Sequence, residues 1–344
     1  MPAPAGASGE AGSLSRIAAR YARFAAGEAR GRSPLYEALA LGVAADRQVL
    51  HVLAGLPVPK QQPNLLFAAV RLLHGTPADW SAFRRALLDD PEAVTRVMLA
   101  RSTQTNEPGR CAVLLPLLAL LPQPLALIEV GASAGLCLLP DRYAYDYGCG
   151  VLGPGGSAPV FPCRADAATP LPDRLPVVAL RAGLDLAPVD LGDPDAVAWL
   201  ETLVWPEQTA RLERLRAAIR VAREAPPPVR RGDLRTDLPA LVAEAPRGAT
   251  LVVFHTAVLA YLDDPAERAA FAASLRGMGA IWIANEAPGA LPGLAADVVG
   301  AADGRSFLLC RDGAPMAWTD PHGAAIRWLG PRQSGSHSGG ITWR

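Results

Sequence analysis

The feature that most constrains the fold of this chain is an alternation, beyond residue 122, of short apolar runs with longer amphipathic stretches. The short runs suit buried strands and occupy residues 125–130, 176–186, 250–256 and 280–284. The stretches between them repeat apolar residues at helical spacing and occupy residues 193–203, 206–224 and 265–276. Strands that alternate with helices are typical of a parallel sheet covered on both faces. The sequence therefore predicts an α/β fold with a doubly wound, mostly parallel sheet.

The chain before this region carries a different pattern. Oxygen-bearing helix caps precede prolines at Ser33-Pro34, Thr76-Pro77 and Asp90-Pro91, and no strand-like alternation interrupts them. We therefore expect an all-helical lobe over residues 14–121, followed by the α/β domain over residues 122–330. Two late runs, at 306–311 and 324–329, are expected to be strands at the sheet edge. Residues 1–13 are expected to be a disordered lead and residues 331–344 a mobile tail.

Composition excludes several classes of partner. The 33 acidic and 33 basic residues balance, so the chain lacks the positive field that drives binding to nucleic acid. Its most apolar stretch, residues 111–130, is interrupted by three prolines, which argues against a membrane-spanning helix. The five cysteines form no pattern with zinc-ligand spacing, and their odd number suggests free thiols in a reducing compartment. These features favour a cytoplasmic protein with no metal site, and leave its oligomeric state open.

A glycine-rich turn, Glu129-Val130-Gly131-Ala132-Ser133-Ala134-Gly135, follows the first predicted strand and is expected to open a helix. Glycine permits a tight turn and a close approach of the backbone to a ligand, and helix N-terminal amides favour polar or negative groups. The turn lacks the GxGxxG spacing of a dinucleotide site, and the chain contains no GxxxxGK[ST] phosphate loop. An ordinary strand-to-helix turn also needs glycine, so the alternative is a purely structural turn.

An acid ends the second predicted strand, in Gly183-Leu184-Asp185-Leu186-Ala187-Pro188. In doubly wound nucleotide sites an acid at this position accepts hydrogen bonds from ribose hydroxyls. Asp185 follows Gly131 by 54 residues, more than the usual ~20, so we expect an insertion at about residues 145–175. Asp146 is the rival ribose ligand. It is disfavoured because the segment before it leaves little room for both a helix and a strand.

Other polar residues at predicted strand and helix ends complete the candidate site. His255 lies at the end of the predicted strand at 250–256 and has a side chain suited to general-base catalysis near neutral pH, and Glu286 lies at the end of the strand that begins at residue 280. Glu107 and Arg110 begin a helix of the helical lobe and are expected to orient a substrate. If that lobe is a lid, both should face the rim that carries His255 and Glu286. The alternatives are a structural histidine and a local ion pair at the helix start.

The order of these motifs resembles that of class I S-adenosylmethionine-dependent methyltransferases over residues 125–330. That resemblance implies a Rossmann-like sheet with S-adenosylmethionine as cofactor. Glu129, Gly131 and Gly135 would border the methionine moiety, with Ser133 where the family often has a middle glycine. Asp185 would bind the ribose. Asp233, in Arg231-Gly232-Asp233-Leu234, would meet the adenine amino group.

The chain also resembles, over nearly its whole length, the uncharacterised bacterial domain of unknown function 2332 family. The matching segments are 105–110, 129–136, 181–185, 205–208 and 254–257. This resemblance implies no activity. The leading hypothesis is therefore a methyltransferase acting on an unidentified small molecule.

Three alternatives remain open at this level. A methyltransferase-like binding protein without catalysis fits the same motifs. Gly131-Ala132-Ser133-Ala134-Gly135 also matches the spacing of a nucleophile elbow, so a hydrolase with Ser133, His255 and Asp185 is possible in chain order. It ranks lower because it gives Glu129 and the Gly-Asp segment no role. A dinucleotide oxidoreductase is opposed by the missing third-glycine spacing.

Overall fold

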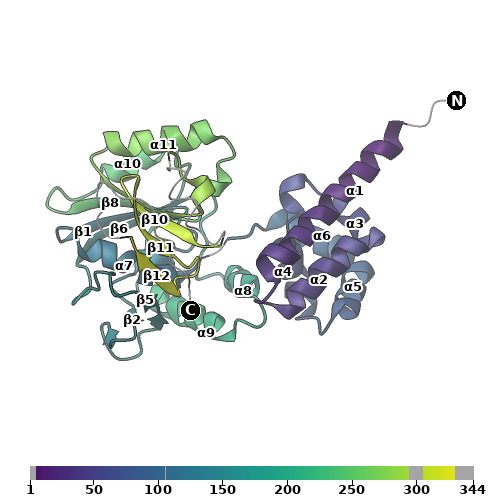
Figure 1. The fold of residues 1–344 in the computed structure, drawn as a ribbon, viewed down its shortest axis with the longest axis horizontal. Coiled ribbons are helices and arrows are strands. Elements are labelled where there is room, and N and C mark those ends of the chain that lie inside the picture. The colour runs from purple at the N-terminus through teal and green to yellow at the C-terminus, as the bar shows by residue number, and fades with distance from the viewer. Residues whose placement is uncertain (1–4, 105, 294–304, 330–344) are drawn as a thin grey trace, which may run out of the picture. The chain divides into compact units, whose positions relative to one another are not determined.

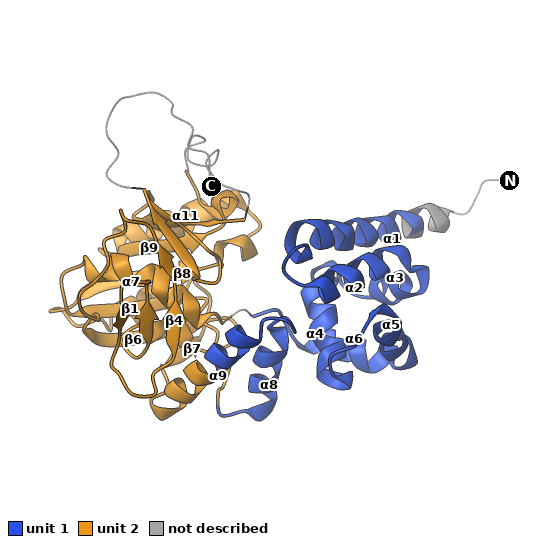
Figure 2. Cartoon of the chain, turned by 60° about the horizontal axis from the view of Figure 1, so that its bottom comes forward, with its two compact units in different colours: residues 1–105, 192–216 blue, residues 106–191, 217–344 orange. Residues whose placement is uncertain are grey.

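The computed structural model describes residues 5–104, 106–293 and 305–329. The chain forms two compact units, shown in different colours in Figure 2. Unit 1 comprises residues 1–105 and 192–216, and unit 2 comprises residues 106–191 and 217–344. The sequence-based boundary at residue 121 differs from this division at two places. Residues 106–121 belong to unit 2, because helix α7 (Cys111–Ala119) packs within it, and residues 192–216 return to unit 1.

Unit 1 is helical, as expected. Its helices are α1 (Ala5–Phe24), η1 (Ala25–Ala29), α2 (Pro34–Ala45), α3 (Arg47–Ala54), η2 (Val58–Lys60), α4 (Pro63–His74), α5 (Trp80–Asp89), α6 (Pro91–Ala100) and α8 (Pro194–Leu203). Helix α9 (Thr209–Glu224) crosses the boundary between the units. Because α1 begins at Ala5, most of the predicted disordered lead is helical; only residues 1–4 of it, like the predicted tail, lie outside the described residues.

Helix caps in unit 1 follow the sequence signals with one exception. The side chains of Ser33 and Asp90 accept hydrogen bonds from the first turns of α2 and α6. The Thr76-Pro77 signal is wrong, because the cap of α5 is Asp79, whose Oδ1 accepts from the Ala82 amide at 2.8 Å. In this unit the Arg71 guanidinium also ties α4 to the end of α8, donating to the Thr202 carbonyl at 2.8 Å.

Unit 2 is built on a nine-stranded, mostly parallel sheet, with strands in the order β5-β12-β11-β10-β9-β8-β1-β6-β7. Five neighbouring pairs are parallel, and only the pairs from β9 to β12 are antiparallel. The strands are β1 (Leu125–Val130), β5 (Arg164–Ala165), β6 (Val178–Asp185), β7 (Val229–Arg231), β8 (Thr250–Thr256), β9 (Ile281–Glu286), β10 (Phe307–Arg311), β11 (Ala314–Thr319) and β12 (Ala325–Trp328). The predicted strands correspond to β1, β6, β8, β9, β10 and β12. The strands β5, β7 and β11 have no counterpart among the apolar runs.

The connection from β1 to β6 departs from the expectation of a helix after the glycine turn. The only helical element in this segment, which is described throughout, is a single 3₁₀ turn, η4 (Leu136–Leu138). A three-stranded sheet then forms from β2 (Ala144–Asp146), β3 (Val151–Leu152) and β4 (Val160–Pro162). This small sheet fills most of the insertion expected at residues 145–175. The glycine turn therefore has no helix N-terminus behind it.

Helices cover both faces of the large sheet (Figure 1). Helices α10 (Leu238–Val242) and α11 (Pro265–Gly277) cover one face, where Ile128 and Val253 join an apolar core with Phe271 and Leu275. Because side chains alternate along a strand, Glu129 points to the opposite face. That face carries η3 (Pro108–Arg110) and α7, every side chain of which is buried except at its last residue.

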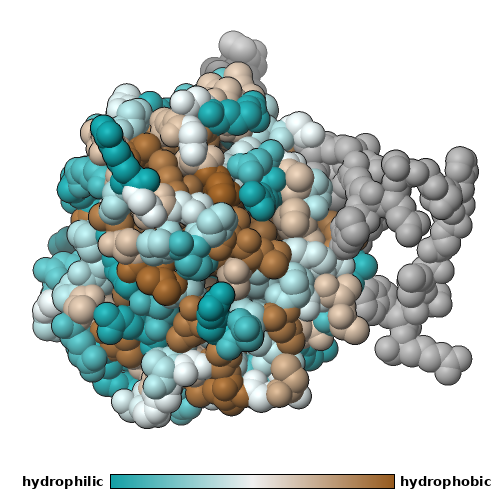
Figure 3. Space-filling view, turned by 90° about the vertical axis from the view of Figure 1, so that its left-hand side faces the viewer, coloured by the Kyte–Doolittle hydropathy of each residue, from teal (hydrophilic) through white to brown (hydrophobic). Residues whose placement is uncertain are grey.

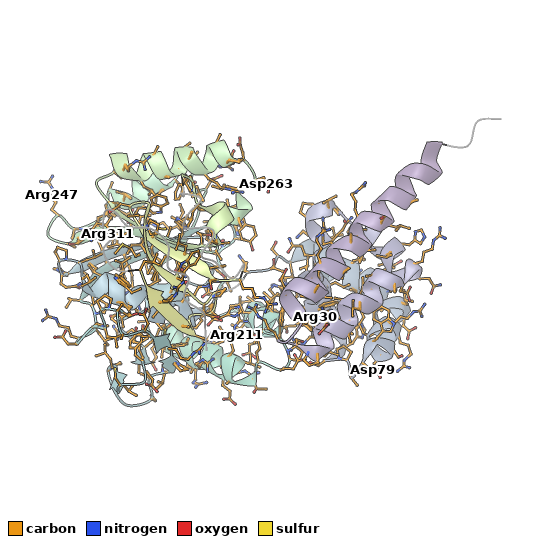
Figure 4. The ribbon with its side chains drawn as sticks, viewed as in Figure 1. Arg30, Asp79, Arg211, Arg247, Asp263 and Arg311 are labelled. Atoms are coloured by element: carbon orange, nitrogen blue, oxygen red, sulfur yellow. The ribbon has the colours of Figure 1, made fainter. Side chains whose placement is uncertain are left out.

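One face of the molecule is shown in Figure 3, where apolar residues are interspersed with hydrophilic ones, as on most folded proteins. Charged side chains such as that of Arg247 point outward from unit 2 in Figure 4. Among the described helices, none is both long and apolar enough to cross a membrane.

Candidate functional site

The candidate site lies at the carboxyl ends of the central parallel strands. In the sheet, β6 and β7 lie on one side of β1, and β8 and β9, which come later in the chain, lie on its other side. In open α/β sheets the crevice at such a reversal is where ligands bind. The predicted residues Asp185 and Glu286 are the last residues of β6 and β9, while Glu129 and His255 are the last but one of β1 and β8.

The glycine turn at the end of β1 is fixed by backbone conformation and packing. Gly131 and Gly135 have φ angles of 69° and 71°, which side chains with a Cβ rarely adopt. A Cβ on Gly131 would lie 2.4 Å from Val258 Cγ2, and one on Gly135 would lie 2.7 Å from Pro227 Cγ. Ser133 also has a positive φ, 52°, which is unusual for a residue other than glycine. Both glycines are thus required by the protein's own structure.

Asp185 connects this turn to the neighbouring strand. Its Oδ2 accepts a hydrogen bond from the Ser133 amide at 2.7 Å, and its Oδ1 accepts from the Ala187 amide at 2.8 Å. Each carboxylate oxygen has a second lone pair for another donor. Asp146 instead ends a strand of the small sheet and accepts from the Gly148 amide. The structure therefore places Asp185, and not Asp146, beside the glycine turn.

Asn106 is a site residue whose position the sequence analysis missed. Asn106 could have capped the helix that begins at Pro108, but the cap is Glu107, whose Oε1 accepts from the Gly109 amide at 3.0 Å. The Asn106 side chain spans the glycine turn instead. Its Nδ2 donates to the Ala132 carbonyl at 2.8 Å, and its Oδ1 accepts from the Leu136 amide at 3.2 Å. An asparagine two residues before a proline is a common helix-start signal, and no local pattern pointed to a contact with the glycine turn.

Glu129 is a buried carboxyl group with an incomplete set of partners. Its side chain is 3% exposed, and Oε2 has no hydrogen-bond partner among the described residues. Burial raises the pKa of Glu129 well above its usual range; Cys137 and Asp185 raise it further, and the Arg110 guanidinium opposes them. The protonated carboxyl is therefore favoured. A raised pKa in a strand-end crevice is a feature typical of functional sites.

Arg110 fastens η3 to the sheet. Its Nη1 donates to the Thr256 carbonyl and to Thr256 Oγ1, both at 3.1 Å, and its Nε donates to the Pro321 carbonyl at 2.9 Å. Arg110 and Glu107 are 4% and 5% exposed. Both belong to unit 2, so their contacts give no support to a lid formed by the helical lobe. Arg110 therefore holds η3 in place, and its expected substrate-orienting role stays a prediction.

His255 is corrected from general base to structural residue. Its side chain is fully buried; Nε2 lies 2.8 Å from the Trp282 indole Nε1, and Nδ1 lies 2.7 Å from Glu286 Oε1. An indole N–H can only donate, so Nε2 accepts and the proton of the neutral ring is on Nδ1. Both ring nitrogens are therefore occupied. The sequence showed the histidine at a strand end but gave no sign of Trp282 as its partner.

Glu286 completes this network. Its Oε1 accepts from His255 and from the Val258 amide at 2.8 Å. Its Oε2 has no partner in the part of the chain that is described, although the side chain is wholly buried. Since Trp282 and Ala284 belong to the core under α11, Glu286 points to that face, opposite to Glu129.

Asp233 lies beside the end of β6, because the preceding Gly232 amide donates to the Asp185 carbonyl at 2.9 Å. It follows β7, the edge strand, and is bound by Arg235, whose Nη2 lies 2.6 Å from Asp233 Oδ2. The hydrogen bonds from Arg235 lower the pKa of Asp233. Both oxygens of this carboxylate accept from Arg235, and the contact with an adenine amino group stays a prediction.

Unpartnered buried polar atoms mark the site more clearly than any motif. Within the described ranges they include Glu129 Oε2 and Ser133 Oγ at the end of β1, and Asn285 Nδ2 and Glu286 Oε2 at the end of β9. A buried polar atom without a partner costs free energy, so such atoms are rare and each needs an explanation, of which a bound ligand is one; Tyr21 Oη and Trp318 Nε1 are further examples away from these two strand ends. In the part of the chain that the structure describes, no group of three or more His, Cys, Asp or Glu side chains could hold a metal ion.

The structure does not bring Ser133 and His255 together as the hydrolase alternative requires. Ser133 has the positive φ expected of a nucleophile elbow, but its Oγ has no hydrogen-bond partner among the described residues. The ring nitrogens of His255 are bonded to Trp282 and Glu286 instead. Asp185, the proposed third member, holds backbone amides.

Comparison with known proteins shows which family this chain belongs to. The sequence matches, over residues 18–328, the family described as "Uncharacterized protein conserved in bacteria (DUF2332)". The chain belongs to this family. The match covers both units and all the candidate residues of this DUF2332 protein. No curated protein and no solved structure matches the chain. The description of the DUF2332 family names no reaction, so an activity has to be argued from the site.

Proposed function

We propose that this protein is an S-adenosylmethionine-dependent methyltransferase for a small molecule, with a Rossmann-like core in unit 2. The observation that carries the proposal is the strand order. Numbered along the chain, the parallel strands β7-β6-β1-β8-β9 read 3-2-1-4-5, the order of doubly wound nucleotide-binding sheets. The glycine turn and Asp185 are hydrogen-bonded to each other where that order reverses.

The residues that would hold the cofactor are those at the ends of β1 and β6. Ser133 Oγ and Glu129 Oε2 are buried and unpartnered in the described structure, and Asp185 retains acceptor capacity for ribose hydroxyls. The fit is partial: both glycines are accounted for by the protein's own packing, and Asp233 is bound by Arg235. When bound, S-adenosylmethionine supplies a methyl group on a sulfonium centre.

The chain's own contribution is then positioning. His255 is neutral with both ring nitrogens bonded, so it has no free lone pair with which to take a proton from a substrate. Holding two reactants in line can by itself contribute much of a rate enhancement, roughly 7–11 kcal/mol in well-oriented systems. Glu286 Oε2 is the group best placed to orient a substrate, since it is unpartnered within the described residues and rigidly held.

The proposal is tested by titrating the purified protein with S-adenosylhomocysteine, by calorimetry and by thermal melting. A ligand that binds the native state raises the melting temperature by mass action, by an amount that grows with concentration. NAD⁺, titrated in parallel, serves as the control for a dinucleotide site. No heat and no shift at millimolar S-adenosylhomocysteine, with folded protein, would reject the methyltransferase. Binding of NAD⁺ alone would favour the oxidoreductase alternative.

A non-catalytic binding protein is the second candidate, and one observation favours it. His255, the expected base, is bonded at both ring nitrogens to other residues of the protein. Incubation with S-adenosylmethionine and a bacterial metabolite extract, followed by intact-mass analysis, separates the two. A product heavier by one methyl group identifies the catalyst, and binding without any product identifies the binder.

A further inference from the structure

The end of β9 contains a carboxylate that is rigidly held on one side and open on the other. Trp282 donates to His255, and His255 donates to Glu286 Oε1, which also accepts from the Val258 amide. These contacts fix the orientation of the carboxylate plane. They leave Oε2 without a hydrogen bond to any described residue, at 0% exposure.

The same network leaves Glu286 without a counter-charge. Its recorded ion-pair partner among the described residues is His255, which is charged only when protonated on both nitrogens. Because the Trp282 indole occupies Nε2 as a donor, His255 is neutral. Val258 contributes an uncharged amide. A buried carboxylate with neutral partners is costly, and a cation that also donates hydrogen bonds removes that cost.

The position of Glu286 separates it from the proposed cofactor residues. Glu129 and Asp185 lie on the sheet face that carries α7, whereas Glu286 lies on the face covered by α11. It is nevertheless close to the glycine turn, since Val258 bonds to Glu286 through its amide and packs on Gly131 with its side chain. The chain reaches the surface three residues further on, at Gly289, which is exposed.

We propose that Glu286 Oε2 is the binding group for a cationic amine, so that the substrate class of this site is small molecules with a protonated or hydrogen-bonding amino group. The assignment of that amine to a substrate rests on the proposed function. Trp282 and His255 are positioning residues, which act through the orientation of the carboxylate. An ammonium ion has several donors for one oxygen acceptor and supplies the missing charge.

The Trp282 indole N–H provides a direct reporter, because it is two hydrogen bonds from Oε2. Its ¹H–¹⁵N resonance, assigned with Trp282→Phe, is followed while methylammonium chloride is added to the protein, once without and once with saturating S-adenosylhomocysteine. Sodium chloride at equal ionic strength and methanol are the controls for salt and for a neutral group of the same size. We expect a saturable shift with methylammonium alone.

Variants locate the effect. Glu286→Gln should weaken methylammonium binding at least about tenfold, the loss of one charge-assisted hydrogen bond. Glu244→Gln, at an exposed glutamate paired with Arg230, should leave it unchanged. The comparison of methylammonium with methanol uses the wild-type chain, so it decides the matter even if Glu286→Gln does not fold.

Distinct results overturn the two proposals. A shift that is linear, equal with sodium chloride or methanol, or retained in Glu286→Gln rejects the amine site. Loss of the shift on saturation with S-adenosylhomocysteine rejects it too, because the cation site would then belong to the cofactor. Methylammonium binding by a protein that fails to bind S-adenosylhomocysteine supports the amine site and rejects the methyltransferase.

Discussion

At the scale of single residues, Asp185 has a structural task besides the proposed ligand contact. Its two oxygens hold the amides of Ser133 and Ala187, so the acid shapes the glycine turn. We expect Asp185→Ala to weaken S-adenosylhomocysteine binding by about 1.5–3 kcal/mol, the usual cost of a lost charged acceptor. Calorimetric titration measures this loss.

Asp146→Ala is the matched control for that variant. Asp146 also caps a turn with one carboxylate oxygen, but it does so in the small sheet. Its replacement should leave the dissociation constant for S-adenosylhomocysteine unchanged. Equal losses in the two variants would show that the effect is a general destabilisation and not a lost contact at the site.

Glu129 makes stability depend on pH in an unusual direction. Its pKa in the folded protein lies well above the ordinary 4.5 because the group is buried. Its contribution is therefore fully present below pH 4.5 and is lost as the pH rises towards the folded-state pKa, by up to about 1.4 kcal/mol per pH unit. Glu129→Gln, which resembles the protonated form, should gain stability relative to wild type between pH 5 and pH 8. Denaturant melts at both pH values measure this, and a difference independent of pH would contradict it.

The Trp282–His255 contact predicts a defined tautomer. In Trp282→Phe, His255 Nε2 loses its donor while remaining buried, which should cost about 1–3 kcal/mol of unfolding free energy. Trp328→Phe, at a half-buried tryptophan of the same unit, is the comparison variant. Ring ¹⁵N shifts of wild-type His255 should show a protonated Nδ1 and a bare Nε2. The opposite tautomer would invalidate the proposed orientation of Glu286.

At the scale of elements, the turn after β1 depends on one side chain of the segment after β8. A Cβ on Gly131 would meet Val258 Cγ2 at 2.4 Å, and the φ angle of 69° adds strain. We expect Gly131→Ala to destabilise by about 2 kcal/mol or more, from a backbone cost of about 1–2 kcal/mol plus the clash. Val258→Ala should relieve the clash but not the backbone cost. A double-mutant cycle by urea unfolding measures the coupling, and strict additivity would show that the two residues do not interact.

The strands themselves were largely predictable. The bounds of β1 and β8 coincide with the apolar runs, because a strand buried on both faces has a continuous apolar sequence. The helix expected after the glycine turn is absent from this segment. Its prediction rested on the usual strand–turn–helix order and not on periodicity. Residues 136–143 have too few helical repeats to form one, and the chain enters the small sheet instead.

At the scale of the whole molecule, we expect binding of S-adenosylhomocysteine to slow hydrogen exchange in unit 2 and not in unit 1. Hydrogen–deuterium exchange with S-adenosylhomocysteine should slow in peptides that cover residues 125–137 and 183–190, where the proposed cofactor residues lie in unit 2. Peptides from α2 to α6 of unit 1 provide the internal comparison. Slowed exchange there as well is what a helical lid predicts, while unchanged exchange at 125–137 would remove the cofactor from the glycine turn.

The division into units was itself only partly visible in the sequence. The helical character of the first hundred residues follows from local caps and spacing, and the structure confirms it. The transfer of residues 106–121 to unit 2 and of residues 192–216 to unit 1 depends on which apolar faces meet. Periodicity shows that a helix has an apolar face, but it does not identify the surface that will cover it.

The sequence alone determined the alternating strands and helices, the glycine turn, Asp185 as the acid of the second strand, and the family. Local patterns are sufficient for these, because they depend on residues within one element. Tertiary structure alone decided that Asn106 spans the turn, that Arg235 binds Asp233, and that Trp282 and Glu286 occupy both nitrogens of His255. The chemistry of a histidine depends on the donors and acceptors around it. For His255 these lie 27 and 31 residues away and reach it only through the pairing of β8 with β9.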